Sequence, residues 1–182
     1  ISDTHCYAED SSRLVWVPLP VYPNQSLSRV LDHLKQREPC HALVISGDLA
    51  QEEIAATYQR INTLLEPFPA PIYVLPGNHD IPELMHAELT NPNIHVLEQA
   101  DYEHWHCLFL DSSRPLHGEG YLTTEKLTEL QQALNQLPFA HHALIFLHHH
   151  PSLIGSPWMD KMGLQHPEPF WELVTAFPQV KA

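Results

Sequence analysis

The chain is poor in basic residues for its length. Only nine of its 182 residues are Lys or Arg, against 22 Asp and Glu, which gives a formal net charge of −13. Proteins that bind long nucleic acids neutralise phosphates with clustered Lys and Arg, so this composition argues against such a partner. If the protein handles phosphate groups, a bound cation has to supply the positive charge.

Cysteines and long apolar runs are also scarce. Cys6, Cys40 and Cys107 are odd in number and show no Cys-x-x-Cys spacing, which fits reduced thiols in the cytoplasm better than a disulfide framework. No apolar run approaches the roughly 18 residues needed to cross a bilayer, so we expect no membrane segment. The chain begins at Ile1 without a Met, a basic flank or a long apolar core, so we expect no signal peptide.

Apolar runs and helical patterns alternate along the chain. Short apolar runs that end abruptly in polar residues predict strands at residues 1–2, 41–46, 71–75, 105–110 and 143–147. Apolar residues spaced by three and four predict helices over residues 27–34, 54–65, 127–137 and 170–177. This alternation predicts a layered α/β domain with largely parallel strands, and the length fits a single domain over residues 1–182.

Local signals mark the helix ends. Asn24 or Ser26 is the expected N-cap of the first helix, and Thr123 or Thr124 is expected to open the third. Pro169 belongs in the first turn of the last helix, where its missing N–H costs nothing. The Pro-rich segment from residue 7 to 23 predicts a long loop between the first strand and the first helix.

Polar residues follow the predicted strands directly. They are Asp3, His5, Asp48, Asn78, His79 and the run His148–His150. Because the carboxyl ends of parallel strands lie along one edge of a sheet, these side chains are expected to converge there. Carboxylate, imidazole and amide oxygen without thiolate suit two borderline divalent ions such as Mn²⁺, Fe²⁺ or Zn²⁺. Two such ions about 3.5 to 4 Å apart need a bridging anion, and Asp48 is the expected bridge.

Each motif also has an ordinary structural explanation. Gly47-Asp48 alone is usually a turn, and Asp3-Thr4-His5 can form an Asx-type turn with a surface His. Gly77-Asn78 is a common turn pair, and the three consecutive imidazoles can simply face solvent at a strand end. The joint occurrence of all four motifs after predicted strands favours a metal site.

The order of these motifs resembles a known family. The patterns D-x-H, G-D, G-N-H-D and H-x-P occur in the calcineurin-like metallophosphoesterases, and the stretches ISDTH, SGDLAQ, LPGNHD, LHGEG and FLHHHP are most similar to the bacterial 3′,5′-cyclic AMP phosphodiesterase branch. The resemblance covers nearly the whole chain. It implies a four-layer α/β/β/α sandwich with a binuclear metal centre that hydrolyses phosphoesters.

The resemblance implies a role for each matched position. It makes Asp3 and His5 ligands of one metal, Asp48 the bridge, and Asn78 and His149 ligands of the second metal. His79 is implied as the imidazole that protonates the leaving group, with Asp80 orienting it. Substrate contacts are implied for Asn78, His79 and His117. His148 and His150 are then neighbours of the ligand, which either support it or face solvent.

One family motif is not found. The last motif of the family, Gly-His-x-His, follows one further strand and supplies two more imidazole ligands. This sequence ends at residues 177–182, where that strand is expected to begin, and it opens two residues into the first strand. We therefore expect a domain cut at both ends, whose 182 residues bind metal weakly and turn over slowly or not at all.

The implied activity is hydrolysis of 3′,5′-cyclic AMP to 5′-AMP by two divalent ions and the proton donor His79. The expected partner is a small phosphoester substrate and no long nucleic acid, and a homodimer is an open alternative to a monomer. Two other functions stay open from the sequence. One is hydrolysis of a different nucleotide or lipid phosphoester, and the other is a metal-binding scaffold without catalysis.

Overall fold

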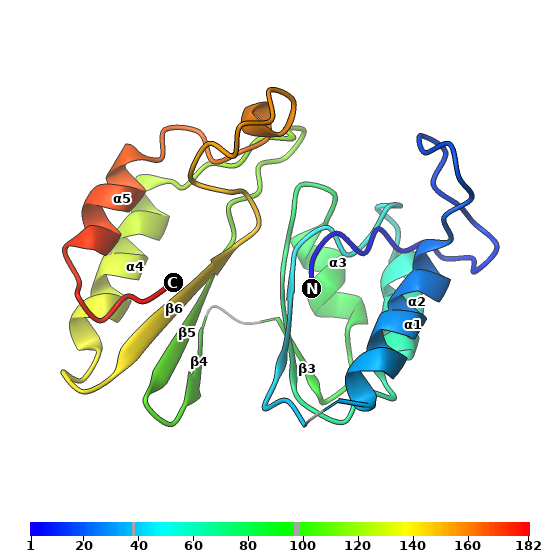
Figure 1. Ribbon diagram of the computed structural model, residues 1–182, viewed down its shortest axis with the longest axis horizontal. Helices are drawn as coiled ribbons and strands as arrows, with labels where there is room; N and C mark the ends of the chain where they lie inside the picture. The colour runs from blue at the N-terminus through cyan, green and yellow to red at the C-terminus, as the bar shows by residue number, and fades with distance from the viewer. Residues whose placement is uncertain (38, 97–98) are drawn as a thin grey trace. The chain divides into compact units, whose positions relative to one another are not determined.

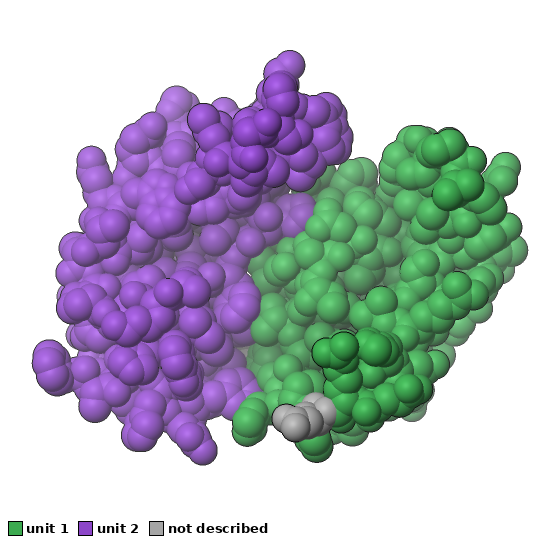
Figure 2. Space-filling view, in the orientation of Figure 1, with its two compact units in different colours: residues 1–96 green, residues 97–182 purple. Residues whose placement is uncertain are grey.

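The chain folds into two compact units with the same general plan. The computed structural model describes residues 1–37, 39–96 and 99–182, and contacts divide it into a first unit of residues 1–96 and a second unit of residues 97–182 (Figures 1 and 2). Each unit has a three-stranded sheet with helices packed on one face. The α/β class predicted from the sequence is confirmed, whereas the single domain over residues 1–182 stays a prediction.

The first unit is built on a parallel sheet. Its strands are β1 (Leu43–Ser46), β2 (Ile72–Leu75) and β3 (Ile94–Val96), in the order β1-β2-β3, and its helices are α1 (Pro23–Lys35), α2 (Ala55–Leu65) and α3 (Pro82–Glu88). Both strand pairs are parallel, with Ile72 opposite Leu43 on one side and Ile94 on the other. The helices predicted for this region and the strands predicted at residues 41–46 and 71–75 are present, and β3 and α3 are additional.

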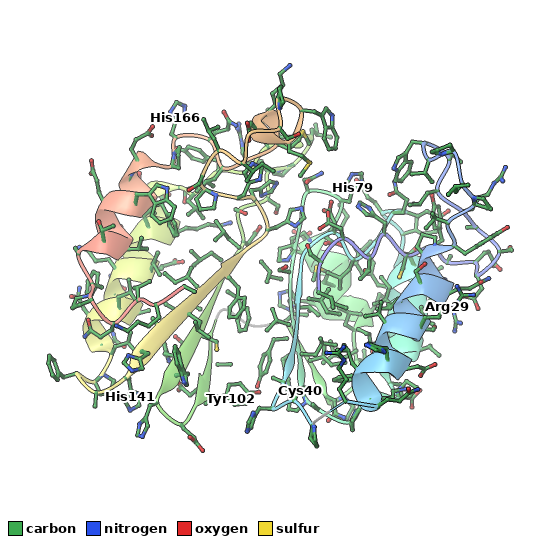
Figure 3. All side chains as sticks on the ribbon, in the orientation of Figure 1. Arg29, Cys40, His79, Tyr102, His141 and His166 are labelled. Atoms are coloured by element: carbon green, nitrogen blue, oxygen red, sulfur yellow. The ribbon has the colours of Figure 1, made fainter. Side chains whose placement is uncertain are left out.

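The core of the first unit lies between the helices and one sheet face. Apolar residues of all three helices meet alternate residues of β1 and β2, and Tyr58, Ile61 and Ile72 are at most 1% exposed. Burying each such large apolar side chain contributes about 1.5 to 3 kcal/mol, so this layer anchors the loops that leave the sheet. Figure 3 shows His79 and Cys40 at opposite ends of this unit, at the carboxyl and amino ends of its strands.

Helix α1 begins earlier than predicted. Its N-cap is Tyr22 and Pro23 takes the first helical position, so the prediction of Asn24 or Ser26 as the N-cap is wrong. Pro23 is suited to that position because its φ is fixed near the helical value. The side chain of Asn24 is used elsewhere: its oxygen accepts from the Tyr7 amide at 2.9 Å and its nitrogen donates to the Tyr7 carbonyl at 2.9 Å.

The first residues run beside β1 without forming a regular strand, contrary to the prediction for residues 1–2. The Ile1 carbonyl accepts from the Ser46 amide at 2.9 Å, and Cys6 forms an isolated parallel bridge with Ala50. Between these two points the segment follows the chain that leaves β1. This pairing places Asp3 and His5 next to the end of β1.

The second unit has a mixed sheet. Its strands are β4 (Gln99–Tyr102), β5 (Trp105–Leu110) and β6 (His142–Leu147), with α4 (Thr124–Gln136), the short 3₁₀ helix η1 (Met159–Lys161) and α5 (Glu168–Thr175). β5 pairs antiparallel with β4 and parallel with β6. Thr123 caps α4 by accepting from the Lys126 amide, which confirms one of the two predicted caps. Near the C-terminus, Val180 bridges in parallel to Ala143 of β6.

The second core has the same construction as the first. Leu130 and Leu134 of α4 and Phe170 and Val174 of α5 pack against the face of the sheet that carries Leu108. The spacing of these helical residues is the one from which the helices were predicted. No helix in the described part of the chain has the length and apolar character needed to span a bilayer.

Candidate metal site

Unusual backbone conformations gather where β1 ends. Asp3, His5 and Asp48 have φ values of 55°, 43° and 52°, and Gly47 has a φ of 94°. Non-glycine residues in this left-handed region are uncommon and cost of order 1 to 3 kcal/mol each, so surrounding bonds must hold them. Here the Asp3 amide donates to the Gly47 carbonyl at 3.1 Å and the His5 amide donates to the Asp48 carbonyl at 3.0 Å.

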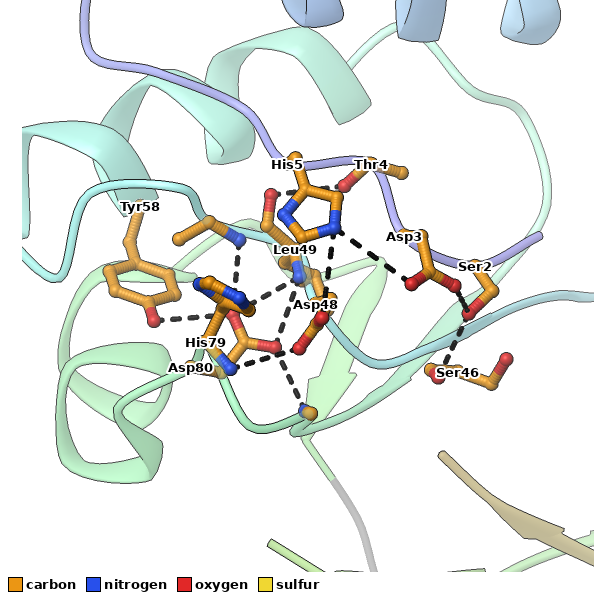
Figure 4. A network of polar contacts seen from close by, with 12 residues as sticks. Ser2, Asp3, Thr4, His5, Ser46, Asp48, Leu49, Tyr58, His79 and Asp80 are labelled. Carbon is orange, nitrogen blue, oxygen red and sulfur yellow. Dashed lines mark hydrogen bonds and ion pairs between the residues drawn. The ribbon is translucent and has the colours of Figure 1, made fainter. Parts of the chain in front are cut away.

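This backbone brings two carboxylates to one imidazole (Figure 4). Nε2 of His5 lies 3.8 Å from Oδ1 of Asp3 and 3.7 Å from Oδ2 of Asp48. These separations are too long for hydrogen bonds. They are close to the spacing of two ligands around one cation with bonds of about 2.0 to 2.3 Å. Nδ1 of His5 is buried and has no hydrogen-bond partner among the described residues.

His79 lies against the same group. Its ring is edge-on to the ring of His5, with centroids 5.1 Å apart. Its backbone amide donates to Oδ1 of Asp48 at 2.9 Å, and Asp48 is only 4% exposed. His5, Asp48 and His79 each offer a ligand atom, all within 4.8 Å of one another. The imidazole predicted as a proton donor is therefore also within reach of a cation held by the other two residues.

Asp80 holds the loops together from beneath. Its carboxylate accepts from the backbone amides of Leu49, Ala50 and Gly77 at 3.0 to 3.1 Å, and from the Tyr58 hydroxyl at 3.2 Å. Burial raises the pKa of this carboxyl, and the amides of Gly77, Leu49 and Ala50 oppose that rise. The carboxylate thus joins the loop after β1 to the loop after β2 through backbone hydrogen bonds. The predicted contact with the His79 imidazole stays a prediction.

Gly77 leaves room for Asp48. A Cβ added at Gly77 would lie 2.2 Å from Oδ1 of Asp48 and 2.4 Å from its backbone nitrogen. Both distances are far below van der Waals contact, so only glycine fits there. The close backbone approach predicted for Gly77 is confirmed. Asn78 follows in the turn and is partly buried, and its role as a ligand stays a prediction.

In the second unit, His149 is fixed in a buried position. It is 3% exposed, and its Nδ1 lies 2.8 Å from Oγ of Ser112, which is fully buried. A Cβ added at Gly120 would lie 2.3 Å from Cγ of His149, so a second glycine makes space for this ring. The ring of His148 packs edge-on against it, with centroids 4.9 Å apart. Ser112 was not predicted, although it follows β5 as directly as the predicted residues follow their strands.

His117 lies on an exposed loop of the second unit. Its Nδ1 is 2.9 Å from Oε1 of Glu119, and its side chain is 45% exposed. The pKa of the Glu119 carboxyl is lowered, mainly by a hydrogen bond to the backbone amide of Glu119 itself and next by the hydrogen bond to His117. Arg114 also lies 3.5 Å from this carboxylate. The substrate contact predicted for His117 stays a prediction.

Comparison with known proteins places this fold and these motifs in a family. The model of the calcineurin-like phosphoesterases matches residues 1–175, so the chain belongs to that family. It is 37% identical to the 3′,5′-cyclic adenosine monophosphate phosphodiesterase CpdA of Vibrio vulnificus and 33% identical to that of Pseudomonas aeruginosa. It is 29% identical to a 3′,5′-cyclic-nucleotide phosphodiesterase of a Nostoc species.

These relatives are longer than the chain described here. Each match takes in all of this chain but only 65% of the Vibrio and Pseudomonas proteins and 66% of the Nostoc protein. The chain therefore spans about two thirds of the length of these relatives.

Proposed function

We propose that the protein is a metal-dependent phosphodiesterase that hydrolyses 3′,5′-cyclic AMP to 5′-AMP. The observation that carries this proposal is the group formed by His5, Asp48 and His79, whose ligand atoms lie within 4.8 Å of one another. The names of the Vibrio and Pseudomonas relatives support the same substrate. The excess of acidic residues is compatible with a phosphate substrate only if cations neutralise it locally.

The donor set fits divalent ions. His5 has one buried ring nitrogen without a hydrogen-bond partner among the described residues, and its other nitrogen faces two carboxylates. Nε2 is too far from both carboxylates for a hydrogen bond, so an ion bound between them would satisfy all three groups. We assign Asp3, His5, Asp48, Asn78 and His149 as ligands of two ions, with Asp48 as the bridge. Nitrogen and oxygen donors without thiolate suit Mn²⁺, Fe²⁺ or Zn²⁺.

When bound, two such ions would neutralise the phosphoryl oxygens and lower the pKa of the attacking water. The residues of the chain supply the rest. His79 donates a proton to the departing O3′ of the ribose, which opens the cyclic diester to the 5′-monophosphate. The bond from the His79 amide to Asp48 ties the proton donor to the carboxylate at the centre of the group. Asp80 fixes the backbone of both loops beneath them.

The substrate is a small phosphoester, and Asn78, His79 and His117 contact it. Cys6, Cys40 and Cys107 are all free thiols, which supports a cytoplasmic protein.

A second candidate substrate is a cyclic nucleotide with another base. The Nostoc relative carries a name that does not specify the base, although its identity with this chain is 29%. The scaffold function is less well supported, because a scaffold gains nothing from the His79 imidazole beside the acidic group.

The direct test is His79→Ala in the full-length gene product. Turnover of cyclic AMP should fall by roughly 10² to 10⁴, the usual contribution of a positioned proton donor. His86→Ala, on the exposed side of α3, is the matched control and should leave turnover unchanged. Calorimetric titration with Mn²⁺ on the same variants separates the two roles open to His79: a proton donor leaves ion affinity unchanged, and a ligand does not. Unchanged turnover in His79→Ala would reject the proposed role.

A further inference from the structure

An exposed indole lies beside the candidate metal site. Trp16 is 56% exposed, and its ring is edge-on to the ring of His5, with centroids 6.1 Å apart and an angle of 78° between the planes. His5 therefore has the proton donor His79 against one side of its ring and Trp16 near another. A tryptophan left this exposed does not contribute its full area to the core, so its position calls for a partner.

The loop that carries Trp16 is anchored at its base. Asp10 accepts two bonds from the guanidinium of Arg60, at 2.8 and 2.7 Å, and a third from Asn24 at 2.8 Å. Asn24 is 2% exposed, so this connection reaches into the core. Further along, the Leu14 amide donates to the Val21 carbonyl at 3.0 Å and closes the tip at residues 15–20. The tip thus projects from a fixed point.

The tip itself is apolar and stiff. It reads VWVPLP, and Pro18 and Pro20 restrict its backbone. Val15 and Leu19 are 83% and 73% exposed. The same loop closes a pocket of about 340 Å³ along residues 1–5, with Leu14, Val21 and Leu27 in its lining. Exposed apolar side chains therefore lie beside the stretch that carries Asp3 and His5.

We propose that Trp16 is the stacking platform for the nucleobase of the substrate. This assignment rests on the proposed cyclic-nucleotide function. In a cyclic nucleotide the base and the phosphate are attached to the same ribose, so a phosphate at the His5 group carries its base to nearby surface. Indole rings stack on any base through their faces, and a platform held in place before binding loses little conformational entropy. The base is thereby bound by stacking and the phosphate by the acidic group.

The test compares two substrates in the full-length gene product. One is cyclic AMP, and the other is the 3′,5′-cyclic phosphate of 1,4-anhydroribitol, which has the same ring system without a base. Trp16→Ala should lower kcat/KM for cyclic AMP by about 5- to 150-fold, the range expected for one lost base–aromatic stack. The base-free substrate should be hydrolysed within twofold of the wild-type rate. Trp16→Phe should keep most of the cyclic AMP activity.

Trp105→Phe is the control, because Trp105 is another exposed indole, at the amino end of β5 in the second unit. This variant should leave kcat/KM unchanged for both substrates. Equal losses on both substrates in Trp16→Ala would overturn the assignment, because Trp16 would then act only through His5. Unchanged kcat/KM for cyclic AMP would overturn it as well. A wild-type protein that neither hydrolyses nor binds cyclic AMP in calorimetry would instead overturn the proposed function on which it rests.

Discussion

The two units hold their candidate site residues in different ways. In the first unit, Asp3, His5 and Asp48 sit in left-handed backbone conformations that are held by hydrogen bonds between two neighbouring segments. In the second unit, His149 follows the regular strand β6, and its Nδ1 lies within hydrogen-bond distance of the buried Ser112 hydroxyl. The first arrangement depends on hydrogen bonds between backbone groups of two segments, and the second includes a side-chain hydroxyl behind the candidate ligand His149.

This difference separates two kinds of sensitivity. Changes beneath the site of the first unit should affect folding and activity together, because the same loops carry both the core anchor and the ligands. A change behind His149 should weaken ion binding with a smaller loss of stability than a change beneath the first site.

Asp80→Ala should destabilise the protein by at least about 4 kcal/mol. It removes the acceptor for three buried backbone amides and for the Tyr58 hydroxyl, and each unsatisfied buried donor costs about 1 to 3 kcal/mol. The free energy of unfolding from urea titration measures the loss. Asp32→Ala is the control, because its carboxylate is exposed on α1 and pairs with Lys35. A loss below 1 kcal/mol for Asp80→Ala would show that the loops do not depend on this carboxylate.

Ser112→Ala should weaken the binding of one ion by about 10- to 100-fold, the usual effect of removing a group that orients a metal-ligating His. The free energy of unfolding should fall by about 1 to 3 kcal/mol, the cost of leaving the buried His149 ring without this partner, which is less than for Asp80→Ala. Calorimetric titration with Mn²⁺ provides the affinities. Ser113→Ala is the matched control, since its hydroxyl donates to Asp111 and not to His149. If Ser112→Ala bound both ions with wild-type affinity, the assignment of His149 as a ligand held by Ser112 would be wrong.

The smallest effect concerns thiol reactivity. Burial raises the pKa of the Cys6 thiol to about 12 and raises that of Cys107, whereas Cys40 is exposed. Since the thiolate is the reactive form, N-ethylmaleimide at pH 8 should modify Cys40 at least about 100-fold faster than Cys6. Mass spectrometry of peptides after timed labelling measures the rates. Comparable rates at Cys6 and Cys40 would show that the segment beside β1 opens readily.

Much of the fold could be predicted because its elements carry periodic apolar patterns. The helices α2, α4 and α5 occur close to where their spacing placed them, and β5 has the predicted bounds. The short elements β3, β4 and α3 were missed because polar residues interrupt them and none shows a continuous apolar run or a full helical period. The predicted start of α1 was wrong for two reasons. Pro23 suits the first helical position, and the side chain of Asn24 accepts a hydrogen bond from the Tyr7 amide of the preceding loop.

The chemistry of the site was predictable in kind, and its geometry only in part. The clustering of Asp3, His5, Asp48 and His79 follows from their places after neighbouring segments of chain, and the need for Gly77 follows from its contact with Asp48. Left-handed backbone at Asp3, His5 and Asp48 has only a weak sequence signal, because Asp and His tolerate this conformation without requiring it. The contacts of Asp80 could not be read from sequence either, since they are made to backbone amides.

The central claim is that the residues at the end of β1 hold divalent ions. The most direct measurement is anomalous scattering from crystals of the full-length gene product grown with Mn²⁺. We expect two anomalous peaks about 3.5 to 4 Å apart, with the Asp48 carboxylate between them and His5 bound to one of them. Clear density for Asp48 and His5 with no anomalous peak within coordination distance of either would contradict the account.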